Sequence, residues 1–245
     1  MTAAATGRLY GIGLGPGDPE LLTVKAVRLI QAAPVVAWFA KAGRRGNART
    51  IVDRWLVPAC LELPLCYPVT TEIPFDDPRY VARLAAFYED GADTIAAHLT
   101  AGRDVALLSE GDPLFYGSFM HLFERLKARF PVTVIPGVTA LSGCLAAART
   151  PGAWGDDALI FLPGTLPLGA LVERLRACDA AAIMKIGRNL PKVRAALERA
   201  GLAGRAIYVE RASMANEIVL PLAEKGDDEA PYFSMVIVPG EGRRP

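Results

Sequence analysis

Short apolar runs alternate with amphipathic stretches along almost the whole 245-residue chain. We expect strands at residues 8–14, 34–39, 104–109, 131–137, 158–162, 181–186, 207–212 and 233–238, and helices at 23–32, 114–129, 138–148, 168–176 and 190–200. Strands that alternate with helices form α/β layers around a mostly parallel sheet. The last strands crowd together without a helix between them, which predicts a mixed sheet in the second half. The predicted fold class is therefore α/β.

A change of composition divides the chain. The segment Arg149–Ala158 concentrates proline, glycine and aspartate, and it is the best candidate for a domain boundary. We therefore expect an N-terminal α/β domain over residues 1–150 and a C-terminal α/β domain over residues 151–245. Hydrophobic residues make up 52% of the chain, which is enough for a substantial core.

The overall charge argues against a nucleic acid substrate. The 27 basic and 26 acidic side chains leave a net charge of +1, which gives no long-range attraction for RNA or DNA. Four cysteines without a C-x-x-C pair are typical of reduced thiols, and two distant histidines argue against a metal site. The N-terminus has no signal-peptide pattern, and no apolar stretch has the continuity of a membrane span. We expect a cytoplasmic protein that binds no metal and no membrane.

The first expected strand runs into a glycine-rich loop, "YGIGLGPGDPELL" at Tyr10–Leu22. A dinucleotide-binding loop needs G-x-G-x-x-G and an acidic residue about 20 positions later. Gly11 and Gly13 match, but Pro16 stands where the third glycine belongs, and the second strand ends in "VVAWFAK" without an acid. A P-loop is excluded because no Lys-Ser or Lys-Thr follows the glycines. The loop either brings its backbone close to some other ligand or serves only a tight turn.

Two further segments lie where expected strands end, which is where ligands bind in open α/β sheets. In "SEGDPLFYGS" at Ser109–Ser118, Gly111 lets the backbone approach a ligand. Asp112 in the same segment either contacts that ligand or caps the next helix. In "IPGVTALSG" at Ile135–Gly143, Thr139 has the same two alternatives, and capping is favoured for an isolated threonine.

Taken together, the segments resemble one protein family. "GIGLGPGDPELLTVKA", "EGDPLFYGS", "IPGVTALSG", "IMKIG", "YVERAS" and "YFSMVIV" occur in the order found in the tetrapyrrole methylases, and the match spans residues 9–238. These are S-adenosylmethionine-dependent enzymes that methylate carbons of corrin precursors. "LCYPVTTE" at Leu65–Glu72, the form of the central motif and the chain length are most similar to the members that methylate C20 of precorrin-2 to give precorrin-3A.

The resemblance leaves other acceptors open. The cobalt complex of precorrin-2 and other tetrapyrroles are the nearest alternatives, and a protein or ribosomal RNA is more distant. A non-enzymatic tetrapyrrole carrier is disfavoured, because it would have no reason to hold a full set of cofactor-loop motifs.

The resemblance implies two α/β domains with the active-site cleft between them, in a homodimer. Residues 1–150 would form the walls around the tetrapyrrole, and residues 151–245 would contact the adenosyl group of S-adenosyl-L-methionine. The product would be S-adenosyl-L-homocysteine. The residues that the resemblance assigns to the cofactor are Pro16, Gly111, Asp112, Pro113, Ser118, Thr139, Ala140, Met184, Ala212 and Met235. Met184, by itself an ordinary core residue, would pack against adenine.

Methyl transfer to a carbon depends mainly on the positioning of two reactants. The electron-rich tetrapyrrole can itself be the nucleophile, which agrees with the absence of a Ser-His or Cys-His arrangement. A base that removes the proton from the methylated carbon would help, and Asp112, Glu110 and Tyr116 are candidates.

The stretch "KAGRRGNAR" after the second expected strand gathers Arg44, Arg45 and Arg49. Arginine forks fit carboxylates, of which a corrin precursor carries many, and a solvated basic loop is the equal alternative. If these arginines bind substrate, replacing Arg44 and Arg45 together weakens substrate affinity and spares cofactor affinity. Calorimetry measures both.

Overall fold

The computed structural model describes residues 5–69 and 77–242, and it divides into two compact units, Met1–Thr139 and Ala140–Pro245. Each unit has its own sheet and its own hydrophobic core. The division falls before helix α5 (Ala140–Ala147), whereas the sequence analysis placed it after that helix, at Arg149–Ala158. The last three residues of "LCYPVTTE", 70–72, lie outside the described residues.

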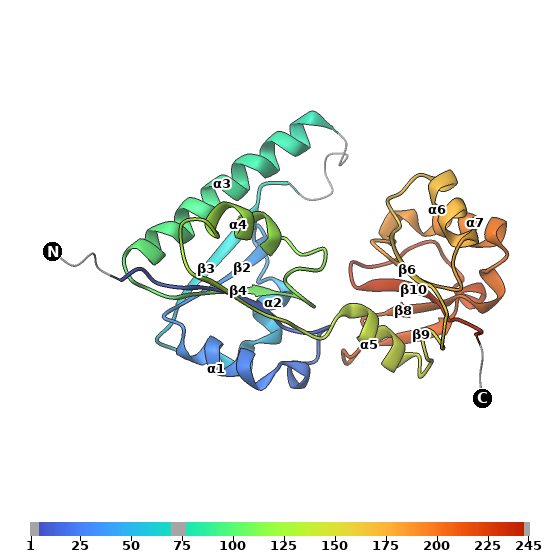
Figure 1. The fold of residues 1–245 in the computed structure, drawn as a ribbon, viewed down its shortest axis with the longest axis horizontal. Coiled ribbons are helices and arrows are strands. Elements are labelled where there is room, and N and C mark those ends of the chain that lie inside the picture. The colour runs from blue at the N-terminus through green and yellow to red at the C-terminus, as the bar shows by residue number, and fades with distance from the viewer. Residues whose placement is uncertain (1–4, 70–76, 243–245) are drawn as a thin grey trace. The chain divides into compact units, whose positions relative to one another are not determined.

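Unit 1 is built on a five-stranded parallel sheet (Figure 1). Its strands are β1 (Leu9–Gly13), β2 (Val35–Lys41), β3 (Leu61–Tyr67), β4 (Val105–Ser109) and β5 (Val132–Ile135), in the spatial order β3-β2-β4-β1-β5. Each neighbouring pair is parallel, so the carboxyl ends of the strands share one edge of the sheet. The segments that follow β1, β2, β4 and β5 are therefore neighbours, although they are far apart in the sequence.

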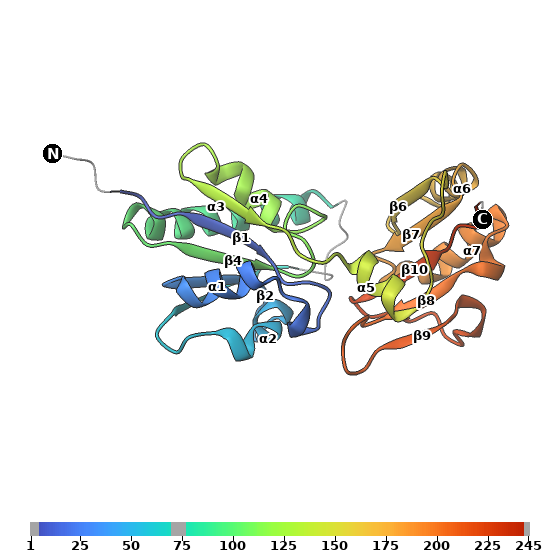
Figure 2. The same ribbon diagram turned by 60° about the horizontal axis from the view of Figure 1, so that its bottom comes forward.

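Helices cover both faces of this sheet (Figures 1 and 2). They are α1 (Val24–Ala32) and α2 (Asn47–Ile51) on one face, and α3 (Pro78–Thr100) and α4 (Phe119–Leu126) on the other. Successive residues of a strand point to opposite faces. Leu107 of β4 accordingly packs with the α3 and α4 side chains, while Leu108 packs with those of α1. Burial on both faces explains the unbroken apolar run of β4.

Local capping explains where the long helices begin. The Thr23 hydroxyl accepts the Ala26 amide at 3.0 Å, which starts α1 as the sequence predicted. Asp77 accepts the Arg79 amide at 2.8 Å, and Pro78 occupies the first turn of α3. Helix α3 and strand β3 were not predicted from the sequence. Helix α4 begins at Phe119, later than predicted, because residues 114–118 form a loop.

Unit 2 contains a five-stranded mixed sheet, as predicted from the crowding of the last strands. Its strands are β6 (Leu159–Pro163), β7 (Ala180–Met184), β8 (Ile207–Glu210), β9 (Ile218–Pro221) and β10 (Ser234–Val238), in the spatial order β6-β7-β10-β8-β9. Only the pair β6–β7 is parallel. Helices α6 (Leu168–Arg176) and α7 (Leu190–Ala200) pack on one face, and α5 packs on the other, against β8 and β10.

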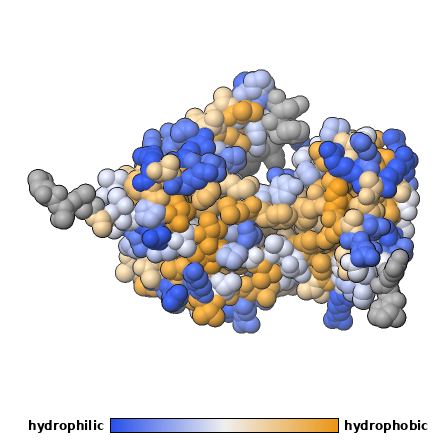
Figure 3. Space-filling view, in the orientation of Figure 1, coloured by the Kyte–Doolittle hydropathy of each residue, from blue (hydrophilic) through white to orange (hydrophobic). Residues whose placement is uncertain are grey.

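The surface of unit 1 exposes apolar side chains around α1. Val24 is 87% exposed, and with Val27 and Trp55 it lines an open hollow of about 460 Å³. Figure 3 shows apolar residues at the surface in the region where Figure 1 draws α1. Across residues 5–69 and 77–242, no helix has both the length and the apolar character needed to cross a membrane.

Candidate active site

The glycine-rich loop after β1 is joined to the "EGDP" segment after β4. The Gly111 amide donates to the Gly15 carbonyl at 2.8 Å, and the Gly15 amide donates back to Gly111 at 3.3 Å. Both glycines have positive φ, 78° for Gly15 and 66° for Gly111, a conformation that residues with a Cβ adopt at a cost. Pro16, next to this bridge, is buried. Two of the segments chosen from the sequence therefore form one backbone unit.

The segment after β5 packs onto the same unit through glycine. A Cβ on Gly137 would lie 2.1 Å from the Gly111 carbonyl oxygen, far inside van der Waals contact. A Cβ on Gly13 would lie 2.4 Å from the Gly137 amide nitrogen. These glycines therefore allow three strand-end loops to lie close to one another.

Asp112 ties these loops together through its carboxylate. Its Oδ1 accepts the Leu114 amide at 2.9 Å, and its Oδ2 accepts the Gly137 amide at 3.1 Å. Both oxygens thus bind backbone groups, one within its own turn and one in the loop after β5. The capping role considered for Asp112 is present, although the turn that it caps precedes α4 rather than starting it.

Glu110 lies between the loops that follow β2 and β4. Its Oε1 accepts the Ala48 amide in the first turn of α2 at 3.2 Å. Removal from water raises the pKa of this carboxyl group, and the hydrogen bonds from its own amide and from Ala48 only partly oppose the shift. Its raised pKa makes the Glu110 carboxylate a stronger proton acceptor than an exposed carboxylate.

Ser118 is held among aromatic side chains. Its Oγ lies 2.5 Å from the Tyr67 hydroxyl, and the Tyr88 hydroxyl donates to it at 3.2 Å. Tyr67 stacks on Phe39, with ring centroids 5.6 Å apart, and His121 stacks on Tyr88 at 4.2 Å. These aromatic residues could not be chosen from the sequence, because no spacing links residues on β2, β3, α3 and α4.

Two other residues of the loop that follows β4, Pro113 and Tyr116, differ in their exposure to solvent. Pro113 is buried, and Tyr116 is 41% exposed with a φ of 58°. The Tyr116 ring packs edge-on against Phe115, with centroids 5.1 Å apart. A left-handed tyrosine is uncommon and turns the chain sharply before α4.

The three arginines of "KAGRRGNAR" have different surroundings. Arg49 is only 9% exposed, and its guanidinium donates to both Glu62 oxygens, at 2.5 and 2.8 Å, and to Asp53 at 2.9 Å. Arg45 pairs with Asp53 at 2.5 Å. Arg44 is exposed, and its guanidinium has no carboxylate within salt-bridge distance in the described part of the chain. Arg49 and Arg45 therefore hold α2 in place, while Arg44 keeps an exposed charge.

The residues chosen in unit 2 lie together. Met184 ends β7, Ala212 follows β8 and Met235 is in β10, and all three join the apolar cluster beneath α5. Ala212 and Met235 are 7% and 3% exposed, and Met184 is partly exposed. Ala140 is the first residue of α5, and Thr139 is the last residue of unit 1.

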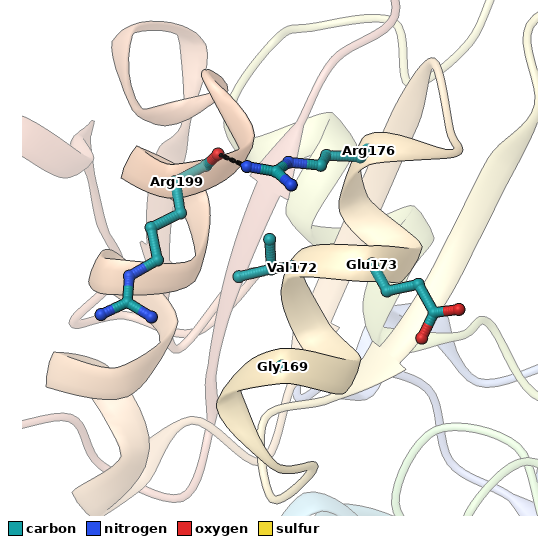
Figure 4. A pocket seen from close by; sticks show the side chains of 5 residues that line it. All are labelled: Gly169, Val172, Glu173, Arg176 and Arg199. Atoms are coloured by element: carbon teal, nitrogen blue, oxygen red, sulfur yellow. Dashed lines mark hydrogen bonds between the residues drawn. The ribbon is translucent and has the colours of Figure 1, made fainter.

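A separate hollow of about 540 Å³ lies on unit 2 between α6 and α7 (Figure 4). Gly169, Val172, Glu173, Arg176 and Arg199 line it. The Arg176 guanidinium donates to the Arg199 carbonyl at 2.9 Å, so it is engaged in joining the two helices. None of the residues chosen from the sequence lines this hollow.

Two further observations bear on cofactors. Within residues 5–69 and 77–242, no three His, Cys, Asp or Glu side chains are grouped as a metal site would require. Cys60, Cys66, Cys144 and Cys178 all have free thiols.

Comparison with known proteins places this fold and these segments in context. The family model for the tetrapyrrole (corrin/porphyrin) methylases matches residues 8–225. The chain is 58% identical to the precorrin-2 C(20)-methyltransferase of a Sinorhizobium species over 245 residues, which is 100% of both chains. It is 28% identical to the cobalt-precorrin-2 C(20)-methyltransferase of Salmonella typhimurium, over 95% of this chain and 96% of that one.

A solved structure has the same fold as this chain. The uroporphyrin-III C-methyl transferase from Thermus thermophilus, complexed with S-adenyl homocysteine, superposes with a TM-score of 0.66 and 25% sequence identity. The similarity covers 95% of this chain and 92% of that one.

Proposed function

The chain belongs to the tetrapyrrole (corrin/porphyrin) methylases, and we propose that it transfers a methyl group from S-adenosyl-L-methionine to C20 of precorrin-2 in cobalamin biosynthesis. The product is precorrin-3A. The observation that carries this proposal is the 58% identity to a precorrin-2 C(20)-methyltransferase along the full length of both chains. Identity to the enzyme named for the cobalt complex is 28%, which favours the metal-free substrate.

The residues present fit S-adenosyl-L-methionine. When bound, the cofactor supplies a methyl group on a positively charged sulfur, which a carbon nucleophile can attack. In unit 1, the joined loops at Pro16, Gly111 and Pro113 bring their backbone to the carboxyl edge of the sheet, where ligands bind in open α/β sheets. In unit 2, a partly exposed thioether at Met184 beside Ala212 is suited to a purine ring.

We assign the cofactor contacts to Pro16, Gly111, Pro113, Thr139, Ala140, Met184, Ala212 and Met235. Asp112 and Ser118 belong to the same loops, and each has bonds within unit 1. Asp112 binds two backbone amides, and Ser118 binds two tyrosine hydroxyls. Their role in the proposal is to hold the loop around Gly111 in shape.

Glu110 is our choice for the base that accepts the proton lost from C20. A general base works best when its pKa is near the working pH, and burial moves the pKa of Glu110 in that direction. Asp112 remains a candidate, but both of its oxygens already accept backbone hydrogen bonds. Tyr116 also remains a candidate, through its exposed position in the same loop.

Arg44 is our choice among the arginines for binding a substrate carboxylate. Its guanidinium is exposed on the loop after β2, whereas the charges of Arg45 and Arg49 are balanced by Asp53 and Glu62. An arginine can donate two parallel hydrogen bonds to a carboxylate, which favours it over lysine for this contact.

The active form that we propose is a cytoplasmic homodimer. The free thiols support a reducing compartment. The apolar surface around Val24 and the hollow beside it support contact with a second copy, because exposed apolar patches mark interaction surfaces. Light scattering on the purified chain is expected to give twice the mass of 26.2 kDa.

One experiment tests the function. The purified protein is mixed with S-adenosyl-L-methionine and precorrin-2, and both S-adenosyl-L-homocysteine and the absorption spectrum are followed. We expect stoichiometric formation of S-adenosyl-L-homocysteine and precorrin-3A. Turnover of the cobalt complex alone would make that complex the substrate in place of precorrin-2. Turnover of another tetrapyrrole alone would overturn the proposed substrate and leave only the assignment to the tetrapyrrole methylases. Tetrapyrrole binding without any turnover would indicate a carrier.

A further inference from the structure

A buried ionic network ends strand β8 in unit 2. The Tyr208 side chain is fully buried, and its hydroxyl donates to Oε2 of Glu210 at 2.6 Å. The Arg211 guanidinium donates to the other carboxylate oxygen, Oε1. Glu210 itself is 7% exposed, so this carboxylate is stabilised by its two partners rather than by water.

The ion pair between Glu210 and Arg211 depends on the conformation of the backbone. Neighbouring residues in a strand point to opposite faces, so their side chains do not normally meet. Arg211 has a φ of 51°, which is left-handed, and this turn brings its guanidinium back onto Glu210. The Arg211 amide at the same point donates to the Phe233 carbonyl at 2.7 Å. The pair therefore favours the turned conformation over an extended one.

The turn sets the direction of the segment that follows. Ser213 is also left-handed, with a φ of 66°, and its amide donates to the Glu217 carboxylate at 2.6 Å. The Met214 amide donates to the Arg211 carbonyl at 2.9 Å. Ala212 lies between the two left-handed residues, in the apolar cluster that includes Met235. Its peptide groups can keep one orientation only while both turns are held.

We propose that Tyr208 and Glu210 are positioning residues for the cofactor. Tyr208, fixed in the core, orients the Glu210 carboxylate, and Glu210 holds Arg211 in the turn that presents the Ala212 backbone to the adenosyl group. Neither side chain contacts the cofactor in this arrangement. The inference rests on the proposed function, since the assignment of Ala212 to S-adenosyl-L-methionine comes from it.

The test is the variant Glu210→Gln in the full chain. The amide that replaces the carboxylate has one acceptor oxygen and no charge, so the ion pair with Arg211 is lost while the size of the side chain is kept. We expect the Kd of S-adenosyl-L-methionine and of S-adenosyl-L-homocysteine to rise about five- to tenfold by calorimetry. The KM for precorrin-2 should stay unchanged. Tyr208→Phe, which removes only the orienting hydroxyl, should give a smaller rise, and Arg211→Lys should retain part of the affinity.

A matched control separates positioning from stability. Asp104 also accepts a tyrosine hydroxyl, that of Tyr10 at 3.4 Å, but it precedes β4 at the amino-terminal edge of the unit 1 sheet. Asp104→Asn should lower the melting temperature and leave cofactor affinity unchanged.

The outcomes are distinct. Wild-type affinity in Glu210→Gln and Tyr208→Phe, with only a lower melting temperature, would overturn the positioning role. If Glu210→Gln does not fold, Tyr208→Phe decides by the same measurement. A wild-type chain that binds neither ligand would overturn the proposed function and this inference with it.

Discussion

Glu110, the proposed base, has a raised pKa that also affects the stability of the fold. Its carboxyl group is removed from water at the end of β4, and its pKa is raised chiefly for that reason. A group whose pKa is higher in the folded state binds its proton more tightly there. The stability that this group contributes is fully present below the pKa that it has in the unfolded chain. That contribution is lost as the pH rises through the pKa that the group has in the folded chain.

Replacing Glu110 with glutamine therefore has two expected effects. The amide oxygen still accepts the Ala48 amide, while the desolvated charge is removed, so the melting temperature at pH 7 should rise above that of the wild type. The difference should shrink as the pH falls through the raised folded-state pKa and should vanish below about pH 4, where the group is protonated in the folded and the unfolded chain. Methyl transfer should fall by about 100-fold or more, since a proton acceptor contributes about 10²–10⁴ to a rate.

The pH profile of the wild type supplies the control for Glu110. Its kcat/KM should rise with pH through the folded-state pKa of this group, and the rise should be absent in Glu110→Gln. A variant that is stabilised but fully active would show that Glu110 is not the base.

At the scale of elements, the loops that follow β1, β4 and β5 pack closely because glycines stand at positions with no room for a Cβ atom. Gly137→Ala would place a methyl group against the Gly111 carbonyl, and we expect a loss of about 1–3 kcal/mol in the free energy of unfolding. Gly169→Ala is the matched control, because nothing lies within 4 Å of its added methyl group in helix α6. That change should stabilise by up to about 1 kcal/mol. Urea denaturation measures both, and equal effects would contradict the packing argument.

The elements also show what could be predicted from the sequence. Helices α6 and α7 were predicted with their observed bounds, because an apolar face and clear ends mark each of them. Helix α3 was missed although Asp77 and Pro78 mark its start and Tyr88, Ala92, Ile95 and Leu99 line its buried face.

The candidate site was predictable only in part. The glycine and GDP segments could be chosen because parallel strands end at one edge. The sequence could not predict the backbone bridge between Gly15 and Gly111. Nor could it predict the hydrogen bonds of Ser118 with Tyr67 and Tyr88. Each joins residues that are distant in the chain, and no periodicity connects them. The ion pair of Arg49 with Glu62 could not be predicted either, because no sequence pattern connects α2 with β3.

At the scale of the whole molecule, the near-zero net charge makes recognition of a polycarboxylate a local matter. With 27 basic and 26 acidic side chains, the chain produces little long-range field to attract an anion. Screening by salt further limits exposed charges to a range of about 8 Å at physiological ionic strength. An exposed arginine can then raise substrate affinity only where it touches the substrate.

The comparison of Arg44→Ala with Arg103→Ala tests this locality. Both arginines are exposed and both substitutions change the net charge equally, but Arg103 precedes β4 at the opposite edge of the sheet from the loop that holds Arg44. We expect Arg44→Ala to raise the KM for precorrin-2 about three- to tenfold, and less at high salt, with an unchanged Kd for S-adenosyl-L-methionine. Arg103→Ala should match the wild type in steady-state kinetics. Equal effects of the two substitutions would mean that total charge rather than a contact governs substrate binding. If neither substitution changed the KM, Arg44 would be part of a solvated basic loop that does not contact the substrate.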